Sequence, residues 1–138
     1  MRLSQAADYA LRAVLYLAKQ GTGVIVDAQT ICEEENIPKR FLLKIFRELA
    51  QTSIIESYRG KNGGYALAIV PAKITLRDVI EAVDGPIVVN RCLVDPDECN
   101  KINGSSCRTC TIHGALFDVQ QTIINRLDEY SFADLLNS

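Results

Sequence analysis

The chain has 138 residues, of which 48% are hydrophobic and 23% are charged. This length limits it to one domain, or to one small domain with an appendage, and excludes a multidomain enzyme. The composition excludes collagen-like, coiled-coil and disordered proteins. No segment approaches the ~18 apolar residues needed for a membrane span, and the N-terminus lacks the apolar core of a signal peptide. We therefore expect a cytoplasmic protein with no membrane partner.

The net charge of −2 comes from 15 Lys and Arg against 17 Asp and Glu. The stretch from Pro38 to Gly64 has six basic residues and only two acidic ones, a local charge of +4, so the rest of the chain carries −6. A basic segment on an acidic chain indicates an anionic partner, although a solvated helix face is the plain alternative.

Apolar residues recur every three or four positions from Leu3 to Lys19, which predicts an amphipathic helix with Ser4 as its N-cap. Asp27 can cap a second, short helix that ends at Glu35. Pro38 suits the first position of a third helix. Two helices joined by a tight turn are expected here.

Two strand patterns, 54–58 and 65–69, flank the glycine-rich segment 59–64 and predict a hairpin with a basic tip. Thr75 and Asp78 form a capping box that opens a further helix, and the helical period returns from Ile112 to Tyr130. The order of these elements predicts a mainly α fold with a small β-hairpin wing, that is, a winged helix-turn-helix.

The third predicted helix carries Arg40, Lys44, Arg47 and Gln51 on one face. Basic side chains on a helix can reach phosphates and guanine edges in the major groove, and a basic wing tip can reach the backbone nearby. The candidate contacts to double-stranded DNA are Lys39, Arg40, Lys44, Arg47, Arg59 and Lys61.

The segment 91–111 has few large apolar residues, so hydrophobic burial alone gives little to order it. Four cysteines and the single histidine gather in or beside it: Cys92, Cys99, Cys107, Cys110 and His113. Metal ligation would explain both observations, because the free energy of metal binding can order such a loop. An iron-sulfur cluster, a zinc site, a reversible disulfide and inert thiols all stay open. Cys32 lies apart and is expected in the core.

Five features of the chain resemble the IscR/NsrR type (Rrf family) of bacterial winged-helix regulators. They are the opening Met1–Ser4, the run Asp8–Ala13, the segment Arg59–Leu67, the turn Val83–Ile87 and the later cysteines. The resemblance implies a homodimer with crossing C-terminal helices, a partly palindromic operator, and a cluster, 2Fe-2S or else 4Fe-4S, whose state alters DNA affinity.

Carried over by position, the resemblance implies that Cys92, Cys99 and Cys110 are cluster ligands, with His113 as the fourth. Cys107 is an additional thiol that could replace Cys110 or His113.

In the NsrR branch an acidic residue of the other subunit is the fourth ligand, and Asp8 occupies that position; Asp8 can instead pair with Arg12. Leu43 stands where the IscR branch has an acidic residue that helps select operators.

These observations divide the chain into a DNA-binding domain (1–86), a cysteine-rich cluster-binding loop (87–111) and a C-terminal dimerisation helix with its tail (112–138). The predicted function is that of a DNA-binding transcriptional regulator, a repressor, controlled by an iron-sulfur cluster that senses iron, oxygen, nitric oxide or redox state. It is not an enzyme and has no small-molecule substrate. The alternatives are a zinc or thiol-disulfide switch and, with less support, an electron carrier.

Overall fold

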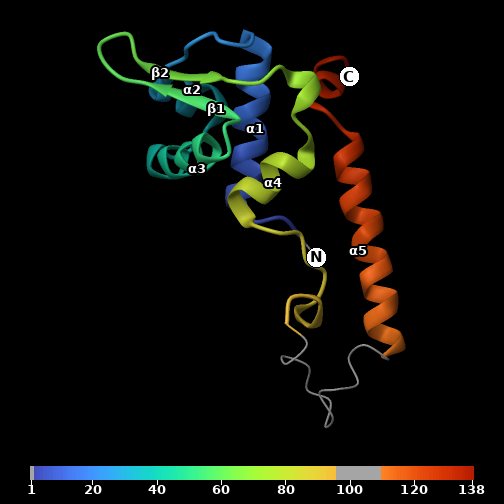
Figure 1. The fold of residues 1–138 in the computed structure, drawn as a ribbon. Coiled ribbons are helices and arrows are strands. Elements are labelled where there is room, and N and C mark those ends of the chain that lie inside the picture. The colour runs from blue at the N-terminus through green and yellow to red at the C-terminus, as the bar shows by residue number, and fades with distance from the viewer. Residues whose placement is uncertain (1, 96–109) are drawn as a thin grey trace.

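The computed structural model describes residues 2–95 and 110–138, and it has the predicted winged helix-turn-helix fold (Figure 1). In chain order the elements are α1 (Gln5–Gln20), α2 (Ala28–Glu35), α3 (Lys39–Gln51), β1 (Ile55–Tyr58), β2 (Gly64–Leu67), the 3-10 turn η1 (Pro71–Lys73), α4 (Leu76–Asp84), the 3-10 turn η2 (Arg91–Leu93), α5 (Thr111–Glu129) and α6 (Phe132–Leu136).

The helix starts follow local side-chain chemistry. Ser4 and Asp27 cap α1 and α2 by accepting backbone N–H bonds, and Thr75 with Asp78 forms a reciprocal capping box on α4, all as predicted. Pro38 differs from the prediction by one position: its ψ of 135° is extended, so it stands at the N-cap and α3 begins one residue later.

The core lies where α1, α2, α3 and α4 meet the hairpin. α1 contributes small side chains, including Ala10 and Ala13, that allow α4 to pack closely against it. The largest fully buried side chains come from almost every element: Val14, Leu17, Ile31, Leu42, Ile45, Phe46, Leu49, Ile55, Leu67, Ile74, Val79 and Phe132. This single core fixes α3 relative to the rest of the domain.

The wing is the antiparallel pair β1–β2, in register Ile55 with Leu67 through Tyr58 with Gly64. The link before α2 adds one isolated bridge, because Val26 and Tyr65 exchange backbone hydrogen bonds of 2.9 and 2.8 Å. A Cβ on Gly64 would overlap the carbonyl of Val26, so only glycine permits this close approach. Strand β2 is thereby paired with the link before α2 as well as with β1.

The end of the chain returns to the winged-helix core. The amide of Leu76 donates to Tyr130 O at 3.0 Å and that of Phe132 to Ile74 O at 2.9 Å, so residues 130–132 are clamped to the start of α4. Phe132 itself is fully buried. The sequence-based division placed these residues in a C-terminal segment with the long helix, whereas α6 packs on α1.

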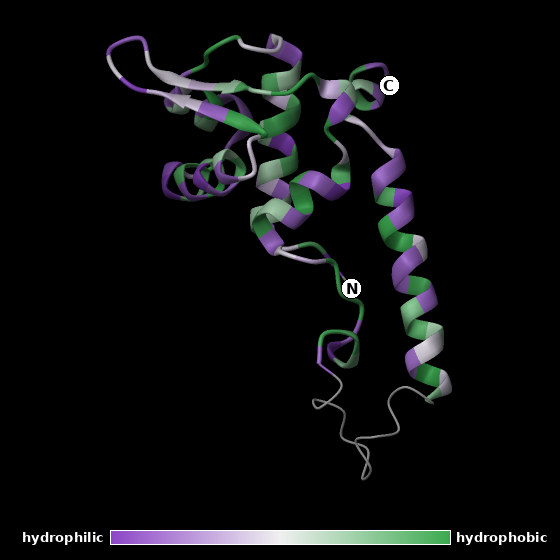
Figure 2. Ribbon diagram, in the orientation of Figure 1, coloured by the Kyte–Doolittle hydropathy of each residue, from purple (hydrophilic) through white to green (hydrophobic). Residues whose placement is uncertain are grey.

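α5 lies along one side of the molecule, apart from the wing (Figure 1). Its hydrophobic and hydrophilic residues alternate along its length (Figure 2), and Gln120 is its single buried residue. Several apolar side chains on it are about half or more exposed: Ile112, Phe117 and Val119. Among the described helices, none is both long enough and apolar enough to cross a membrane.

Candidate nucleic-acid interface and metal-ligand segment

α3 presents a basic surface because its opposite face is anchored in the core. Leu42, Ile45, Phe46 and Leu49 are buried, which turns the remaining positions outward. The predicted contacts Lys39, Arg40, Lys44 and Arg47 are all exposed on this helix.

A groove separates α3 from the wing, with a cavity of about 530 Å³. Tyr65 of β2 and Phe46 of α3 both line it, and their rings pack together with centroids 4.4 Å apart. Arg47 from α3 and Arg59 from the wing line the same cavity. The sequence predicted two separate basic elements, and the structure brings both onto one groove.

The cations of this surface are not neutralised within the described chain. The ion pairs between described residues involve Arg12, Arg77 and Arg126. None of them involves a cation on α3 or on the wing. Lys61 is exposed at the wing tip. Together these residues form a surface suited to an anionic polymer.

The turn before α3 is fixed by backbone geometry and by one arginine. Asn36 adopts the left-handed conformation, with φ of 52°, and ends α2. Arg12 of α1 donates to Glu35 O at 2.9 Å, which satisfies a carbonyl at the end of α2. The Nε of Arg12 lies 3.4 Å from an Asp8 carboxylate oxygen. The intrahelical pairing that the sequence allowed for Asp8 is therefore present.

Four of the six proposed ligands lie in the described chain, and three of these, Cys92, Cys110 and His113, lie at or near the ends of the region 96–109. Cys92 is buried in η2, and its sulfur accepts a hydrogen bond from Asn90 Nδ2 at 3.5 Å. Cys110 is the N-cap residue of α5, and His113 follows in the first turn, half-buried. Cys99 and Cys107 lie outside the described residues. Within the described residues no three potential ligands are grouped.

The donor types of this segment fit a transition metal or an iron-sulfur cluster. η2 and α5 are in contact, so Cys92 lies on an element that touches the helix carrying Cys110 and His113. Thiolate and imidazole are the soft and intermediate ligands that such centres take. The hydrogen bond onto the Cys92 sulfur is of the kind that stabilises a ligating thiolate.

Sequence reasoning did not identify Gln120. Its Oε1 accepts the backbone N–H of Val89 at 3.0 Å, so it joins α5 to the segment before η2. A signal was present, since Gln120 interrupts the apolar stripe between Leu116 and Ile123. A polar residue at such a position is buried only when it has a partner.

Cys32 is half-buried beside the core, as expected, and burial raises the pKa of its thiol. It therefore remains a neutral thiol at physiological pH.

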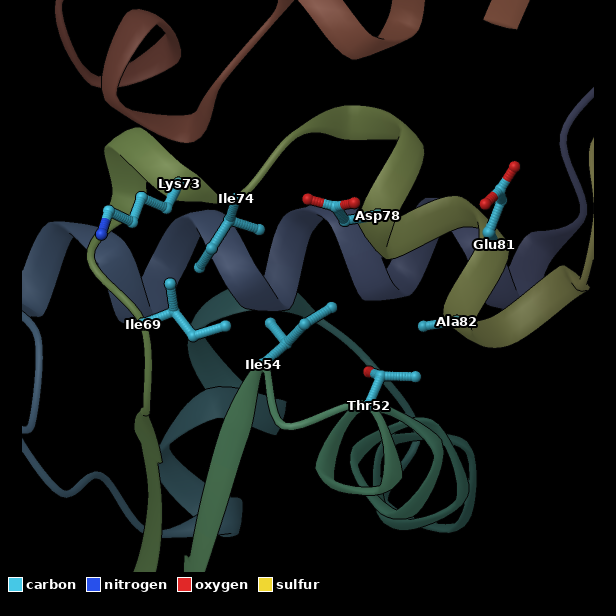
Figure 3. A pocket seen from close by; sticks show the side chains of 8 residues that line it. All are labelled: Thr52, Ile54, Ile69, Lys73, Ile74, Asp78, Glu81 and Ala82. Atoms are coloured by element: carbon cyan, nitrogen blue, oxygen red, sulfur yellow. The ribbon is translucent and has the colours of Figure 1, made fainter.

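A second cavity, of about 380 Å³, lies beside α4 (Figure 3). Its apolar wall includes Ile54, and Lys73 stands at the end opposite Asp78 and Glu81. The two carboxylates already have structural partners: Asp78 caps α4, and Glu81 accepts a bond from Arg77. These contacts assign the carboxylates to helix stability, and the α3–wing groove remains the stronger candidate for function.

Comparison with known proteins identifies relatives over the whole chain. An Aquifex aeolicus protein described as an HTH-type transcriptional regulator is 30% identical over 99% of this chain and 92% of its own. The regulator NsrR of Halalkalibacterium halodurans is 28% identical over 100% of this chain and 92% of its own length. A Mycobacterium tuberculosis regulator is 37% identical over 63% of this chain, and the match spans about half, 54%, of that protein. The agreement with regulators supports the prediction that the chain is not an enzyme.

Solved structures show the same fold. The structure of T. potens IscR matches with a TM-score of 0.75 at 22% identity, over 99% of this chain and 87% of that one. CymR, the global cysteine regulator of B. subtilis, also matches with a TM-score of 0.75 at 22% identity, over 98% of this chain and 95% of that one. The Rrf2 family, described as iron-dependent transcriptional regulators, matches residues 3–138. The chain with its winged helix, basic groove and cysteine segment therefore belongs to the Rrf2 family.

Proposed function

We propose that this regulator is a cytoplasmic repressor that binds operator DNA as a homodimer, with an affinity set by an iron-sulfur cluster. The observation that carries the DNA-binding assignment is the shared groove of Arg47 and Arg59 between α3 and the wing. α3 is of a size that fits the major groove, and the wing can contact the adjacent backbone. The partners are double-stranded DNA and a second copy of the chain.

Helix α5 provides the surface for the dimer. Nineteen residues form this helix, yet only Gln120 is buried, and the exposed Phe117 and Val119 would otherwise remain in water. An amphipathic helix of this length can bury one face on its own domain and another on a partner. Two-fold symmetry would then fix the spacing of two operator half-sites.

Replacing Phe117 and Val119 together by Glu is expected to convert the dimer to a monomer. The two residues stand on opposite flanks of α5, so a charge on the flank that meets the partner would have to be desolvated. Sedimentation velocity measures the change, and operator affinity should fall with it by more than tenfold, since one half-site contact is lost. The control is Asp118→Ala on an exposed position of the same helix. A variant that remains dimeric would contradict the assignment of α5 to the dimer interface.

The cluster would be held by cysteines of the segment 92–110, with His113, Cys107 or the partner subunit's Asp8 completing the set. Once bound, such a centre would supply a redox-active, reagent-sensitive site whose gain or loss changes the net charge of the segment. Cys92 brings a sulfur that already accepts a hydrogen bond, and Cys110 is the N-cap residue immediately before α5. The ligands therefore include the first residue before the proposed dimer helix.

Gln120 provides a route from the ligand segment to the DNA-binding surface. It holds Val89 against α5, while the far end of α5 is joined to α4 through Asp128, which lies 3.8 Å from Arg77 Nη1. A shift of the segment 86–95 would therefore move α5 relative to the winged-helix domain. In the dimer such a movement would change the separation of the two α3 helices. Gain or loss of the cluster would therefore shift the population between two arrangements of the dimer.

The test is anaerobic purification, followed by a visible spectrum and analysis of iron, sulfide and zinc. We expect a coloured protein with equal iron and sulfide, and at least a tenfold difference in operator affinity between the loaded and cluster-free forms. Cys92→Ser should lose most of the iron, whereas Cys32→Ser, the matched control outside the segment, should retain it. A colourless protein with one zinc per chain would instead favour the zinc or thiol switch. Equal affinity of both forms would refute control by the cluster.

A further inference from the structure

A cavity of about 570 Å³ lies between α4, the segment that follows it and α5. Figure 1 shows this segment leaving α4 and running beside α5, with which η2 is in contact. α4 contributes Arg77 and Glu81 to the lining, α5 contributes Gln120 and Ile124, and the segment 86–94 supplies an apolar wall. Cavities of this size, with apolar walls and few polar groups, are typical of sites for small molecules.

Gln120 gives the cavity an unused hydrogen-bond donor. The side chain is only 9% exposed, and it lines the cavity. Its Oε1 accepts the backbone N–H of Val89, whereas its Nε2 donates no hydrogen bond to any described residue. A buried amide nitrogen normally has an acceptor, because burial removes the water that would otherwise accept from it. An occupant of the cavity that carries an acceptor would supply the missing partner.

The charged groups of the cavity already neutralise each other. Arg77 Nε donates to Glu81 Oε1 at 3.1 Å, and Arg77 Nη1 lies 3.8 Å from a carboxylate oxygen of Asp128. A charged occupant would compete with these ion pairs and would also lose water against an apolar wall. An uncharged and mainly apolar molecule avoids both costs, and a carbonyl oxygen is an uncharged acceptor for the amide of Gln120.

We propose that this cavity binds a small uncharged molecule, apolar apart from a carbonyl group, and that the bound molecule alters operator affinity. Gln120 joins α5 to Val89, and Ile124 lies one turn further along the same helix. A molecule between these elements holds α5 in one position relative to α4 and thereby favours one arrangement of the dimer. The effect on DNA rests on the proposed function, whereas binding in the cavity does not.

The experiment titrates the full-length protein with acetophenone, an aromatic ring with one carbonyl group. Ethylbenzene is the matched probe, because it has nearly the same shape without the carbonyl oxygen. In proton–nitrogen NMR spectra the side-chain amide signals of Gln120 should shift with acetophenone. The Kd of acetophenone should be about fivefold lower than that of ethylbenzene, the factor that one net hydrogen bond contributes. Saturation with acetophenone should change operator affinity by about fivefold or more.

Ile124→Trp places a larger side chain in the cavity, and it should abolish both the shift of the Gln120 signals and the effect on DNA. The control is Val70→Trp, at an exposed position outside the cavity, which should retain both. Circular dichroism checks that the two variants are folded, and the comparison of the two probes on wild-type protein needs neither variant.

Equal Kd values for acetophenone and ethylbenzene would overturn the proposal, as would bound acetophenone that leaves operator affinity unchanged. Dissociation of the dimer by Ile124→Trp, measured by sedimentation velocity, would show that a second copy of the chain covers the cavity, which also refutes it. A wild-type protein that binds no duplex would instead refute the proposed function, while the NMR titration still tests the cavity.

Discussion

Replacing Arg47 and Arg59 together by Glu is expected to weaken operator binding by more than a hundredfold at moderate salt. Both side chains line the groove between α3 and the wing, so each substitution replaces attraction for phosphate by repulsion at the same surface. Neither arginine forms an ion pair within the described chain, so their loss leaves no acidic partner uncompensated. The effect should therefore fall on DNA binding and not on folding.

Fluorescence anisotropy between about 50 and 200 mM salt measures the change. The slope of log K against log salt should become shallower by about 0.9 for each phosphate contact removed. Lys19→Glu with Lys73→Glu is the matched control, because it changes the net charge equally at exposed positions outside the groove. If the control loses as much affinity as the groove variant, general charge and not this groove determines binding.

Phe132→Ala is expected to lower the free energy of unfolding by about 3–5 kcal/mol, the range for removal of a fully buried phenylalanine side chain. Phe132 is fully buried, and its amide is bound to Ile74 O. The substitution would leave a cavity between α6 and the core that the clamped backbone cannot close. The winged helix therefore requires the last residues of the chain for its stability.

Urea denaturation with a fixed protein concentration measures this effect, since dimerisation adds a concentration-dependent contribution. Phe41→Ala is the matched control: this ring is 38% exposed, and its loss should cost about 1 kcal/mol or less. Equal losses for the two variants would show that α6 contributes no more than a surface contact. A truncation at residue 129 should reproduce the loss seen with Phe132→Ala.

The local elements of this protein are determined by neighbouring residues. Ser4, Asp27 and the Thr75–Asp78 pair cap helices through contacts within four positions, and Asn36 ends α2 by its own backbone conformation. The spacing of Leu42, Ile45 and Leu49 fixes which side of α3 is basic. These interactions span less than two turns of helix, so the sequence alone predicted helices α1 to α5, the hairpin, their order and the basic face, whereas α6 was not predicted.

Contacts between distant residues decided the remaining features. Tyr65 packs on Phe46 in the lining of the groove, and Gln120 accepts a hydrogen bond from Val89, 31 positions away. Phe132 completes a core formed mainly by the first half of the chain. The clustering of cysteines predicted a ligand segment, and the structure added that Cys92 lies on an element in contact with α5.

The sequence by itself determined the winged helix-turn-helix, its basic reading helix and its cysteine segment, because helix caps, turns and periodicity are encoded over a few residues. Only the tertiary structure decided that α6 closes the core, that Gln120 joins α5 to the ligand segment, and that Leu43, Arg47 and Arg59 face one groove. The reason is physical. Burial and long-range hydrogen bonds depend on which surfaces pack together, and one amphipathic pattern is compatible with many packing arrangements.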